Sequence, residues 1–354
     1  MSLGSVAAVE HLRSSAPGPT VADLGEDALL AQVFPLLPTG DATLLGPGDD
    51  AAVLAAPDGR VVISTDVLVS GRHFRLDWSS GYDVGWRAAV QNLSDIAAMG
   101  AAPTALVVGL VLPTDLPVRW VLDLAGGLAA ACRPHGVGVV GGDLSGGTEV
   151  VVAVTVLGDL GGRAAVLRRG ARPGDVVAHA GTCGRSAAGL ALLTAGAGGG
   201  DGGADGTHGS GGADEQLLAA YRRPVAPVRA GLLAAEHGAT AMLDVSDGLL
   251  RDAARLARAG GVVVDLVEPR RAFGEDLGVL EPVARRLGAD ALAWVLAGGE
   301  DHGLLATFPP DAVLPPPFRP VGRVRAVDGG SVAGVLVDGG PSPVAATGWD
   351  HFRA

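Results

Sequence analysis

One stretch constrains the fold of this chain more than any other, namely residues 89–101, AVQNLSDIAAMGA. Its apolar residues recur at helical spacing, so one face of a helix can be buried while Asn92 and Asp95 lie on a neighbouring stripe. Gly100 and Pro103 then end the helix, and the apolar run 104–112 predicts a buried strand. The pattern therefore predicts a carboxylate carried on a packed helix.

Four other segments place an acid among small residues: 46–50 (GPGDD), 64–66 (STD), 141–143 (GGD) and 244–248 (DVSDG). Any one of these acids alone is typical of a turn or a helix N-cap, and Asp247 is placed to cap a helix predicted over 249–259. Magnesium, however, is commonly held by carboxylates plus substrate phosphates, and clustered carboxylates repel one another without cations. We therefore expect these acids to converge with Asp95 around magnesium and a nucleotide. The aspartates concerned are Asp49, Asp50, Asp66, Asp95, Asp143, Asp244 and Asp247.

The basic residues restrict the chemistry, because all 26 of them are Arg and the chain contains no Lys. Schiff-base chemistry through a lysine is excluded, and so is a Walker A lysine. Phosphate charge must then be neutralised by Arg, by backbone N–H groups or by metal ions. The net charge of −12 argues against an extended nucleic-acid footprint.

Other compositional features indicate a globular cytoplasmic protein. Cys132 and Cys183 are too few for a disulfide framework, and no CxxC or Cys/His cluster suggests zinc. The N-terminus lacks an apolar signal core. Residues 96–114 are uncharged over a nearly membrane-spanning length, but Gly100 and Pro103 divide them. We expect no membrane span and no nucleic-acid partner.

Strands and helices alternate along the chain, so the predicted class is α/β or α+β, and a length of 354 residues suggests two domains. We expect a flexible leader over 1–22, an N-terminal domain over 23–161 and a C-terminal domain over 162–354. Residues 195–213 are glycine-rich and lack the context of a phosphate-binding loop, so they predict a flexible insertion. The turn at 57–60 predicts a hairpin of strands 51–54 and 61–64, and GGDLSGG is expected to be a loop.

The acidic segments belong to a longer ordered set of motifs: GPGDDAAVL (46–54), ISTDVLVSGRHF (63–74), AVQNLSDIAAMGA (89–101), GGDLSGG (141–147), LDVSDGL (243–249), GGEDHGLL (298–305) and GWDHF (348–352). With this set the chain resembles the thiamine-monophosphate kinases, a family within the superfamily of aminoimidazole ribonucleotide synthetase and selenophosphate synthetase. The resemblance covers nearly the whole chain. In GGEDHGLL the chain has His302 and Gly303 where the usual family form has Tyr and Glu.

The resemblance implies ATP-dependent phosphorylation of thiamine monophosphate to thiamine diphosphate, assisted by several Mg²⁺ ions. It implies two α/β domains, the N-terminal one binding ATP and magnesium and pairing its sheet into a barrel across a homodimer. The metal-site residues it implies are Asp50, Ser64, Thr65, Asp66, Asp95, Asp143, Asp244 and Asp247, of which Asp50, Asp95, Asp143 and Asp247 are expected to be catalytic. The implied nucleotide contacts are Gly142, Asp143, Arg168 and Ser246, and the implied substrate contacts are His73, Glu300 and Trp349.

The residue inventory agrees with phosphoryl transfer to a phosphate. The attacking oxygen of a phosphate acceptor is already anionic near neutral pH, so positioning and charge neutralisation are the main tasks. Arg168 or its neighbour Arg169 supplies a planar donor fork. Trp349 can offer a ring face to the thiazolium cation, and Glu300 can balance the same charge or hydrogen-bond the pyrimidine.

Two alternatives remain open at this point. The first is another enzyme of the same superfamily with a different acceptor. Selenophosphate synthesis is disfavoured because no Cys precedes Cys132 and Lys is absent. The relatives that act in hydrogenase maturation use a C-terminal cysteine. The GGED and GWDHF motifs argue against aminoimidazole ribonucleotide synthesis. The second is a non-catalytic protein that binds a nucleotide or a divalent ion.

Overall fold

The computed structural model describes residues 18–47, 51–196, 212–327 and 332–349. The chain divides into two compact units, which we call unit 1 (Met1–Ile96 and Pro103–Gly161) and unit 2 (Ala97–Ala102 and Gly162–Ala354). The boundary between the two units lies between Gly161 and Gly162. Of the residues before it, only the short segment Ala97–Ala102 belongs to unit 2. No helix within the described ranges has the length and apolar character needed to cross a membrane.

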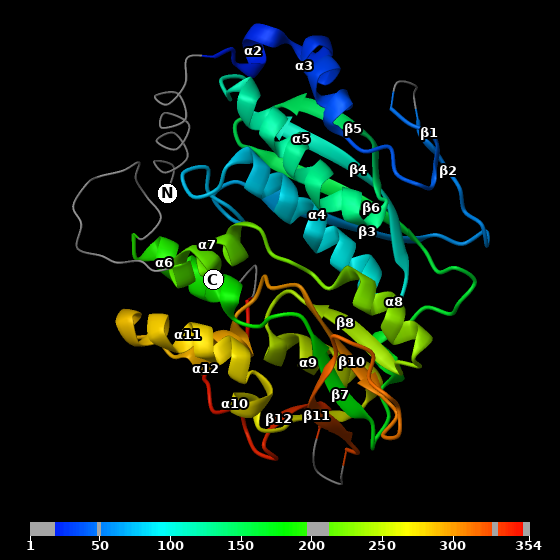
Figure 1. Ribbon diagram of the computed structural model, residues 1–354, viewed down its shortest axis with the longest axis vertical. Coiled ribbons are helices and arrows are strands. Elements are labelled where there is room, and N and C mark those ends of the chain that lie inside the picture. The colour runs from blue at the N-terminus through cyan, green and yellow to red at the C-terminus, as the bar shows by residue number, and fades with distance from the viewer. Residues whose placement is uncertain (1–17, 48–50, 197–211, 328–331, 350–354) are drawn as a thin grey trace. The chain divides into compact units, whose positions relative to one another are not determined.

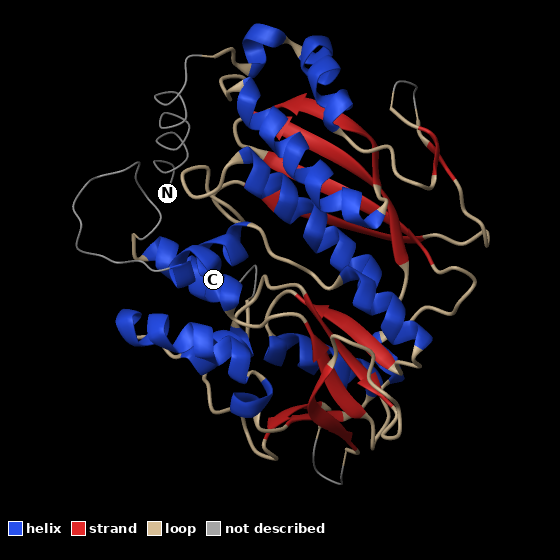
Figure 2. Cartoon of the chain, viewed as in Figure 1, coloured by secondary structure: helices blue, strands red, loops and turns tan. Residues whose placement is uncertain are grey.

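Unit 1 is built on a four-stranded sheet with the strand order β3-β6-β4-β5 (Figure 1). Its strands are β3 (Val62–Val69), β4 (Ala102–Leu112), β5 (Gly138–Gly146) and β6 (Val151–Asp159). β3 pairs with β6 antiparallel, and β4 pairs with β5 in parallel. Helices α4 (Gly81–Ala98) and α5 (Val118–Cys132) lie side by side over one face of this sheet (Figure 2). The helix and strand predicted around Asp95 are thereby confirmed.

Helices α4 and α5 approach each other closely because small residues line their contact. A Cβ atom on Gly85 would lie 2.0 Å from the Leu124 carbonyl oxygen, and one on Gly127 would lie 2.0 Å from the Tyr82 carbonyl oxygen. The apolar stripe of α4, which includes Leu93 and Ile96, is fully buried. Since the helix is fixed along its length, Asp95 is held by packing rather than by a loop.

The remaining elements of unit 1 are α2 (Val21–Leu24), α3 (Glu26–Val33), η1 (Phe34–Leu36), β1 (Thr43–Leu45), β2 (Val53–Leu54) and η2 (Arg133–His135). The predicted leader over 1–22 was too long at its C-terminal end. Thr20 and Asp23 form a capping box at the start of α2, and Val21 N–H donates to the Leu116 carbonyl at 2.9 Å. Residues 20–22 are therefore part of the fold, whereas residues 1–17 lie outside the described ranges.

The predicted hairpin of strands 51–54 and 61–64 is wrong. A turn does form, since Gly59 N–H donates to the Ala56 carbonyl at 3.0 Å, but β2 pairs with β1 and β3 pairs with β6. β3 makes a continuous register of eight residue pairs with β6, from Val62 to Val69. This long ladder determines the partner of β3, so the STD segment lies in the middle of a strand rather than at its end.

The predicted GGDLSGG loop is also wrong, because residues 138–146 form β5. The glycine-rich segment continues the parallel ladder beside β4, with Gly142 opposite Val108 and Asp143 opposite Gly109. A Cβ on Gly142 would lie 1.9 Å from the Val108 carbonyl oxygen. Glycine at this position therefore permits close strand contact rather than a flexible turn.

Unit 2 is built on a six-stranded sheet with the order β12-β9-β11-β7-β10-β8, in which only the β12–β9 pair is parallel. Its strands are β7 (Val176–Ala180), β8 (Ala241–Val245), β9 (Val263–Leu266), β10 (Gly303–Phe308), β11 (Arg319–Arg325) and β12 (Gly334–Val337). Its helices are η3 (Arg168–Gly170), α6 (Arg185–Thr194), α7 (Gly212–Arg222), α8 (Val228–Glu236), α9 (Leu249–Gly260), α10 (Pro269–Ala272), α11 (Gly274–Leu287) and α12 (Ala291–Ala297).

The core of unit 2 lies between this sheet and α6, α9, α11 and α12. It contains Leu192, Leu256, Leu280 and Leu296 from those helices and Val264 from β9. Of the predicted glycine-rich insertion, residues 197–211 lie outside the described ranges, and α7 already begins at Gly212. The last two residues of that predicted insertion therefore belong to a helix.

Candidate functional site

In unit 1, the STD segment of β3 and Asp95 of α4 meet directly. Ser64 Oγ donates a hydrogen bond to Asp95 Oδ2 over 2.7 Å. Asp66 shares a strand face with Ser64, because side chains two residues apart in a strand point the same way. Thr65 points to the opposite face, where its hydroxyl donates to the Val154 carbonyl at 2.9 Å. The structure thus joins Ser64 to Asp95, and it turns the Thr65 side chain away from them.

Asp143 and Gly142 lie on the exposed half of β5, in a strand rather than in the expected loop. Ser145 Oγ donates to Asp143 Oδ2 over 3.1 Å. Gly142 and Asp143 line a cavity of about 540 Å³ within unit 1, whose other walls come mainly from α3, α5 and β4. These walls are largely apolar and include Leu124, Ala125 and Leu128 of α5. Asp49 and Asp50 lie outside the described residues.

His73 follows β3 in a tight turn. Its Nδ1 atom accepts a hydrogen bond from the Val69 N–H at 3.0 Å. In the neutral ring this places the proton on Nε2, since one imidazole nitrogen accepts and the other donates. The turn therefore fixes the orientation of His73 and the donor atom that it can offer.

In unit 2, three of the motifs that are far apart in the sequence come together through backbone hydrogen bonds. Glu300 N–H donates to the Ser246 carbonyl at 2.7 Å, and Trp349 N–H donates to the Asp247 carbonyl at 2.9 Å. His302 N–H donates to the Val245 carbonyl at 3.1 Å. The loops carrying LDVSDGL, GGEDHGLL and the start of GWDHF are therefore one connected structure.

The GGED loop has a constrained backbone. Glu300 has φ 71° and His302 has φ 53°, both in the left-handed region that residues with a Cβ seldom adopt. A Cβ on Gly299 would lie 2.4 Å from the Ser246 carbonyl oxygen, so glycine is needed there for the close approach. Such strain persists where surrounding contacts hold it, and it is common at functional sites.

Asp247 does not cap α9, contrary to the sequence prediction. The N-cap is Gly248, and the Asp247 carboxylate instead pairs through Oδ2 with Arg255 Nη2 at 2.6 Å and Arg251 Nε at 3.7 Å. Asp252 accepts a hydrogen bond from the Asp247 N–H at 2.9 Å. Two arginines on the next turns of α9 compete for the carboxylate, which explains why it turns away from the helix N-terminus.

Asp252 was not predicted from the sequence, and it is the most deeply buried acid of this group. Burial raises the pKa of the Asp252 carboxyl to about 6, and repulsion from Asp244 adds to the rise, whereas Arg255 and the Asp247 N–H offset part of it. Arg255 Nη1 lies 2.5 Å from Asp252 Oδ1. Arg255 follows Asp252 by three residues within α9, so helical spacing was a signal for this pair, whereas the contact of Asp252 with the Asp247 N–H had none.

His302 was not predicted as a site residue either, and it lies near two predicted ones. Its Nδ1 is 3.8 Å from Asp244 Oδ2, and its Nε2 is 3.9 Å from Glu300 Oε2. No sequence pattern places a β10-flanking histidine beside a β8 aspartate, because their proximity depends on the β8–β10 pairing.

Arg168 and Arg169 are exposed on η3, a short helix that packs beside α9 and β8. Within the described ranges, no group of three or more His, Cys, Asp or Glu side chains is close enough together to hold a metal ion. The predicted acids fall into two groups, one in each unit: Asp66, Asp95 and Asp143 in unit 1, and Asp244 and Asp247 in unit 2. Their convergence on one set of ions therefore stays a prediction.

Comparison with known proteins finds relatives that match most of the chain. Residues 48–160 match the family model of the AIR synthase related protein, N-terminal domain. The chain is 44% identical over 337 residues to the thiamine-monophosphate kinase of Mycobacterium tuberculosis (strain H37Rv), covering 94% of this chain and 93% of the relative. The structure of thiamine-monophosphate kinase from Stenotrophomonas maltophilia K279a matches with a TM-score of 0.71 at 31% identity, covering 89% of this chain and 96% of that one. The structure of AaThiL complexed with AMPPCP and TMP matches with a TM-score of 0.70 at 30% identity, covering 95% of this chain and all of that one.

Proposed function

The chain belongs to the thiamine-monophosphate kinase family, and we propose that the residue groups of its two units serve one phosphoryl transfer. The reaction is the ATP-dependent phosphorylation of thiamine monophosphate to thiamine diphosphate. The observation that carries the assignment to this chain's own residues is the set of backbone hydrogen bonds joining three family motifs in unit 2, from Glu300 to Ser246 and from Trp349 to Asp247.

The reaction needs no general base. A phosphate oxygen of thiamine monophosphate attacks the γ-phosphorus of ATP, the bond to the β–γ bridging oxygen breaks, and ADP leaves in line with the attack. The attacking oxygen is already anionic, so the protein must position two phosphate chains and reduce the repulsion between them. Arg168, exposed on η3 and always charged, supplies a planar donor fork for the nucleotide phosphates.

The donor set of unit 1 fits magnesium. Ser64, Asp66 and Asp95 offer hydroxyl and carboxylate oxygens, the hard ligands that this ion prefers. Asp50 and Asp143 complete the proposed group. Bound magnesium supplies charge neutralisation and orientation of the phosphates. In the absence of a cation, the carboxylate of Asp95 is held by the Ser64 hydroxyl, which keeps one of its oxygens in a fixed position.

In unit 2, Asp244 and Asp247 are the proposed magnesium ligands. Among the residues that the structure describes, both ion pairs of Asp247 go to Oδ2, and we assign Oδ1 to the cation. Asp252 accepts from the Asp247 N–H and binds Arg255, so it orients Asp247 without having to touch a ligand itself. Ser246, between the two aspartates, is the proposed nucleotide contact.

The cavity beside Gly142 and Asp143 is the proposed site of the nucleotide base. Its volume of about 540 Å³ lies within the range of small-molecule pockets, and its apolar walls suit a planar ring. Ala125 and the glycines of β5 leave room for such a ring. With the base in this cavity, the polar edge at Asp143 lies on the side where phosphates would continue.

His73, Glu300 and Trp349 are the proposed contacts to thiamine monophosphate. The left-handed backbone at Glu300 and its hydrogen bond to Ser246 fix the direction of the carboxylate, which can balance the thiazolium charge or accept from the aminopyrimidine. The Trp349 ring is half-exposed and can lie against the same cation, a contact worth about 0.5 to 2 kcal/mol. His73 offers its Nε2 proton to a phosphate oxygen.

A homodimer that pairs the sheets of unit 1 is proposed from the apolar side chains on the open sheet face. Ile63 is 65% exposed and Val67 is 48% exposed, and Leu44 and Val53 of the β1–β2 pair are exposed as well. Exposed apolar side chains on an uncovered sheet face are typical of interaction surfaces. We expect a dimer by light scattering, a shift to monomer for Ile63→Asp, and no shift for Val313→Asp, a matched change at an exposed valine of unit 2. A monomeric parent chain would contradict this assembly.

The cytoplasm is the proposed location, in keeping with two buried free cysteines.

A coupled ADP-release assay tests the function. We expect turnover that requires both thiamine monophosphate and a divalent cation. Turnover with another superfamily acceptor and none with thiamine monophosphate would contradict the assignment, and so would nucleotide binding without turnover.

A further inference from the structure

Asp301 is a buried acid of the GGED loop (298–301) that makes none of the proposed contacts to ATP, magnesium or thiamine monophosphate. It is 5% exposed and lies between Glu300 and His302, both of which have a left-handed backbone. The side chain of Glu300, a proposed substrate contact, is 38% exposed, so a ligand can reach it. Whatever holds Asp301 in place therefore bears on the direction of the neighbouring substrate contact.

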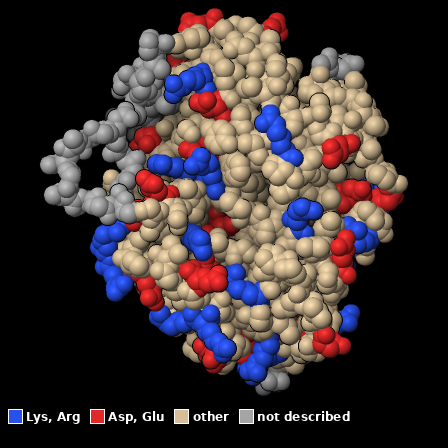
Figure 3. All heavy atoms as spheres, in the orientation of Figure 1, with Lys and Arg blue, Asp and Glu red and all other residues tan. Residues whose placement is uncertain are grey.

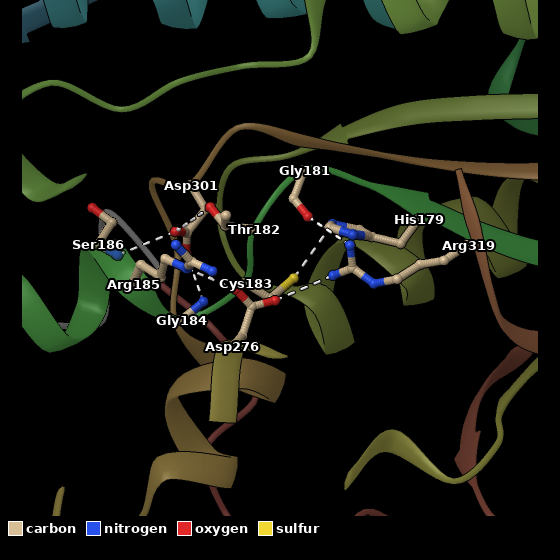
Figure 4. A network of polar contacts seen from close by, with 10 residues as sticks. All are labelled: His179, Gly181, Thr182, Cys183, Gly184, Arg185, Ser186, Asp276, Asp301 and Arg319. Atoms are coloured by element: carbon tan, nitrogen blue, oxygen red, sulfur yellow. Dashed lines mark hydrogen bonds and ion pairs between the residues drawn. The ribbon is translucent and has the colours of Figure 1, made fainter. Parts of the chain in front are cut away.

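The carboxylate of Asp301 accepts three hydrogen bonds from the segment that leads into α6 (Figure 4). Oδ2 accepts from the Gly184 N–H at 2.7 Å. Oδ1 accepts from the Ser186 N–H at 3.1 Å and from the Thr182 hydroxyl at 3.3 Å. These donors precede Asp301 by 115 to 119 residues, so the contact joins two distant parts of the chain. Hydrogen bonds to an ionised acceptor are stronger than neutral ones, which makes this contact a firm anchor.

Helix α6 needs this acceptor because it has no capping side chain of its own. Its N-cap residue is Gly184, and no side-chain hydrogen bond caps the helix from that position. The first N–H groups of a helix lack partners within the helix and favour a negative charge nearby. Burial raises the pKa of the Asp301 carboxyl to about 6, and the bonds from Ser186 and Gly184 limit the rise. Near neutral pH the carboxyl is therefore ionised and caps α6.

Small residues bring the GGED loop close to the first turn of α6. A Cβ on Gly298 would lie 2.6 Å from the Cβ of Ala187. A Cβ on Gly184 would lie 2.8 Å from the carbonyl carbon of Trp294 in α12. Helix α6 is itself fixed, since its Leu192 belongs to the core of unit 2. The N-terminus of α6 is thus a rigid support for the loop.

The GGED loop is therefore held from two sides. On one side, the N–H groups of Glu300 and His302 donate to carbonyls of the LDVSDGL segment. On the other side, the Asp301 carboxylate binds the N-terminus of α6. A left-handed backbone at residues with a Cβ is unfavourable and persists only where the surroundings impose it. Loss of the Asp301 anchor should let the loop relax and turn the Glu300 carboxylate.

We propose that Asp301 is a positioning residue for thiamine monophosphate, because its bonds to the N-terminus of α6 fix the direction of the Glu300 carboxylate towards that substrate. This inference rests on the proposed function, in which Glu300 contacts thiamine monophosphate. Asp301 acts through its neighbour and touches neither substrate. Its loss should therefore weaken the use of thiamine monophosphate without affecting the use of ATP.

The first test is Asp301→Asn, measured by steady-state ADP release. The amide keeps the size of the side chain, but it removes the charge and replaces one acceptor oxygen with an NH2 donor. We expect KM for thiamine monophosphate to rise about tenfold, while kcat and KM for ATP stay within about twofold of the parent. An unchanged KM for thiamine monophosphate in the folded variant would overturn the proposal.

Asp175→Asn is the matched control. Asp175 is also a buried acid of unit 2, and it accepts from the Arg172 N–H at 2.9 Å and from the Thr240 hydroxyl at 2.6 Å. It lies at the end of β7 that pairs with the C-terminal end of β10, away from the GGED loop. We expect it to lower the melting temperature, as Asp301→Asn does, without raising KM for thiamine monophosphate. Equal rises in this KM would indicate a general loss of stability and would contradict a positioning role.

Asp301→Ser serves as a second variant in case the amide variant does not fold. A serine hydroxyl is a small acceptor of the kind that caps helix N-termini, so part of the anchor is kept. We expect KM for thiamine monophosphate to rise about threefold, with KM for ATP unchanged. If the serine variant is the only one that folds, an unchanged KM for thiamine monophosphate decides against the proposal.

Glu300→Gln and the double variant Glu300→Gln/Asp301→Asn separate this inference from the proposed function. If Asp301 acts through Glu300, the double variant should have the same KM for thiamine monophosphate as Glu300→Gln alone. Effects that multiply would overturn the positioning role. An unchanged KM in Glu300→Gln would contradict the proposed function at this residue and the inference with it. A raised KM in Glu300→Gln with an unchanged KM in Asp301→Asn would overturn the inference alone.

Discussion

The two groups of acids in this molecule are positioned in different ways. In unit 1, Asp66 and Asp95 lie on a strand and a helix, are half-buried, and are oriented by the periodicity of those elements. In unit 2, Asp244 and Asp247 are buried and lie at a strand end and in a loop that backbone hydrogen bonds tie to two other loops. Space-filling atoms show acidic and basic side chains interspersed over the visible face of the molecule (Figure 3). Position on regular elements, rather than local concentration of charge, distinguishes the unit 1 acids.

This difference affects how each group of acids would bind a cation. The acids of unit 1 keep their direction when a cation binds, because the strand and the helix that carry them fix it. Acids held by Arg255 and Arg251 are already neutralised, so a cation there must share or displace an arginine. We therefore expect substitutions in unit 1 to reduce turnover with little effect on stability, and substitutions in unit 2 to affect both.

The largest expected effect is that of Asp95→Asn on turnover. Removing this carboxylate removes a ligand for the cation that neutralises the phosphates, and we expect kcat to fall by at least about a hundredfold. The amide keeps the shape of the side chain, so the melting temperature should stay close to that of the parent. Steady-state ADP release and thermal unfolding measure the two quantities. Asp123→Asn, on the partly exposed side of α5, is the matched control, and near-normal turnover of Asp95→Asn in magnesium would place the metal site elsewhere.

A second prediction concerns the pH dependence of unit 2. The pKa of His179 is lowered to about 3 in the folded chain, first by burial and then by the charge of Arg319. A group whose folded pKa is depressed contributes stability above its unfolded pKa of about 6.5, and that stability is lost as the pH falls towards about 3. Between pH 7 and pH 5 the loss is about 2 kcal/mol.

His179→Gln should remove this part of the acid sensitivity. We expect the difference in unfolding free energy between pH 7 and pH 5 to change by about 2 kcal/mol relative to the parent, as measured by denaturant unfolding at both values. His237→Gln, at an exposed position after α8, should behave like the parent. An unchanged pH difference in His179→Gln would mean that the buried imidazole accepts a proton in the folded state.

Arg255→Gln tests whether the acids of unit 2 depend on their arginine. The change leaves the buried Asp252 without its ion-pair partner, and we expect the free energy of unfolding to fall by about 1 to 2 kcal/mol without magnesium. Magnesium should restore part of this loss, because a cation at Asp247 replaces the missing positive charge. Chemical unfolding with and without the ion measures both effects. Equal losses with and without magnesium would argue against Asp247 as a ligand.

The smallest predicted effect belongs to the cavity of unit 1. Ala125→Leu places added methyl groups in the space proposed for the base, and we expect KM for ATP to rise about tenfold while KM for thiamine monophosphate changes little. Ala130→Leu, on the same helix but not on the cavity wall, should leave both constants unchanged. Equal KM values for ATP in the two variants would exclude this cavity as the base site.

Periodicity predicted the parts of this structure in which one element positions a residue. The helix that carries Asp95 and the strand after it were predicted because apolar spacing specifies both the element and its buried face. The hairpin of residues 51–64 was predicted wrongly, because a turn signal shows that the chain reverses but not which strand becomes the partner. The glycine-rich segment of β5 was predicted as a loop and is a strand. Glycines that allow close contact between strands give a segment the same composition as a loop.

The features that the sequence did not predict depend largely on contacts between elements. Asp247 has the sequence position of an N-cap, yet Arg255 two turns along α9 takes its carboxylate. The helix Gly274–Leu287 has helical apolar spacing at Leu277, Leu280 and Ala284, but Pro282 lies inside it and weakens the helical signal. The position of His302 beside Asp244 depends on the pairing of β8 with β10, which is non-local and has no sequence signature of its own.

The most direct measurement of the central claim is anomalous diffraction from crystals grown with Mn²⁺, a non-hydrolysable ATP analogue and thiamine monophosphate. The account predicts manganese peaks in contact with the carboxylates of Asp66 and Asp95 and with those of Asp244 and Asp247, together with both phosphate chains. Ordered ligands whose manganese peaks touch none of these four carboxylates would contradict it.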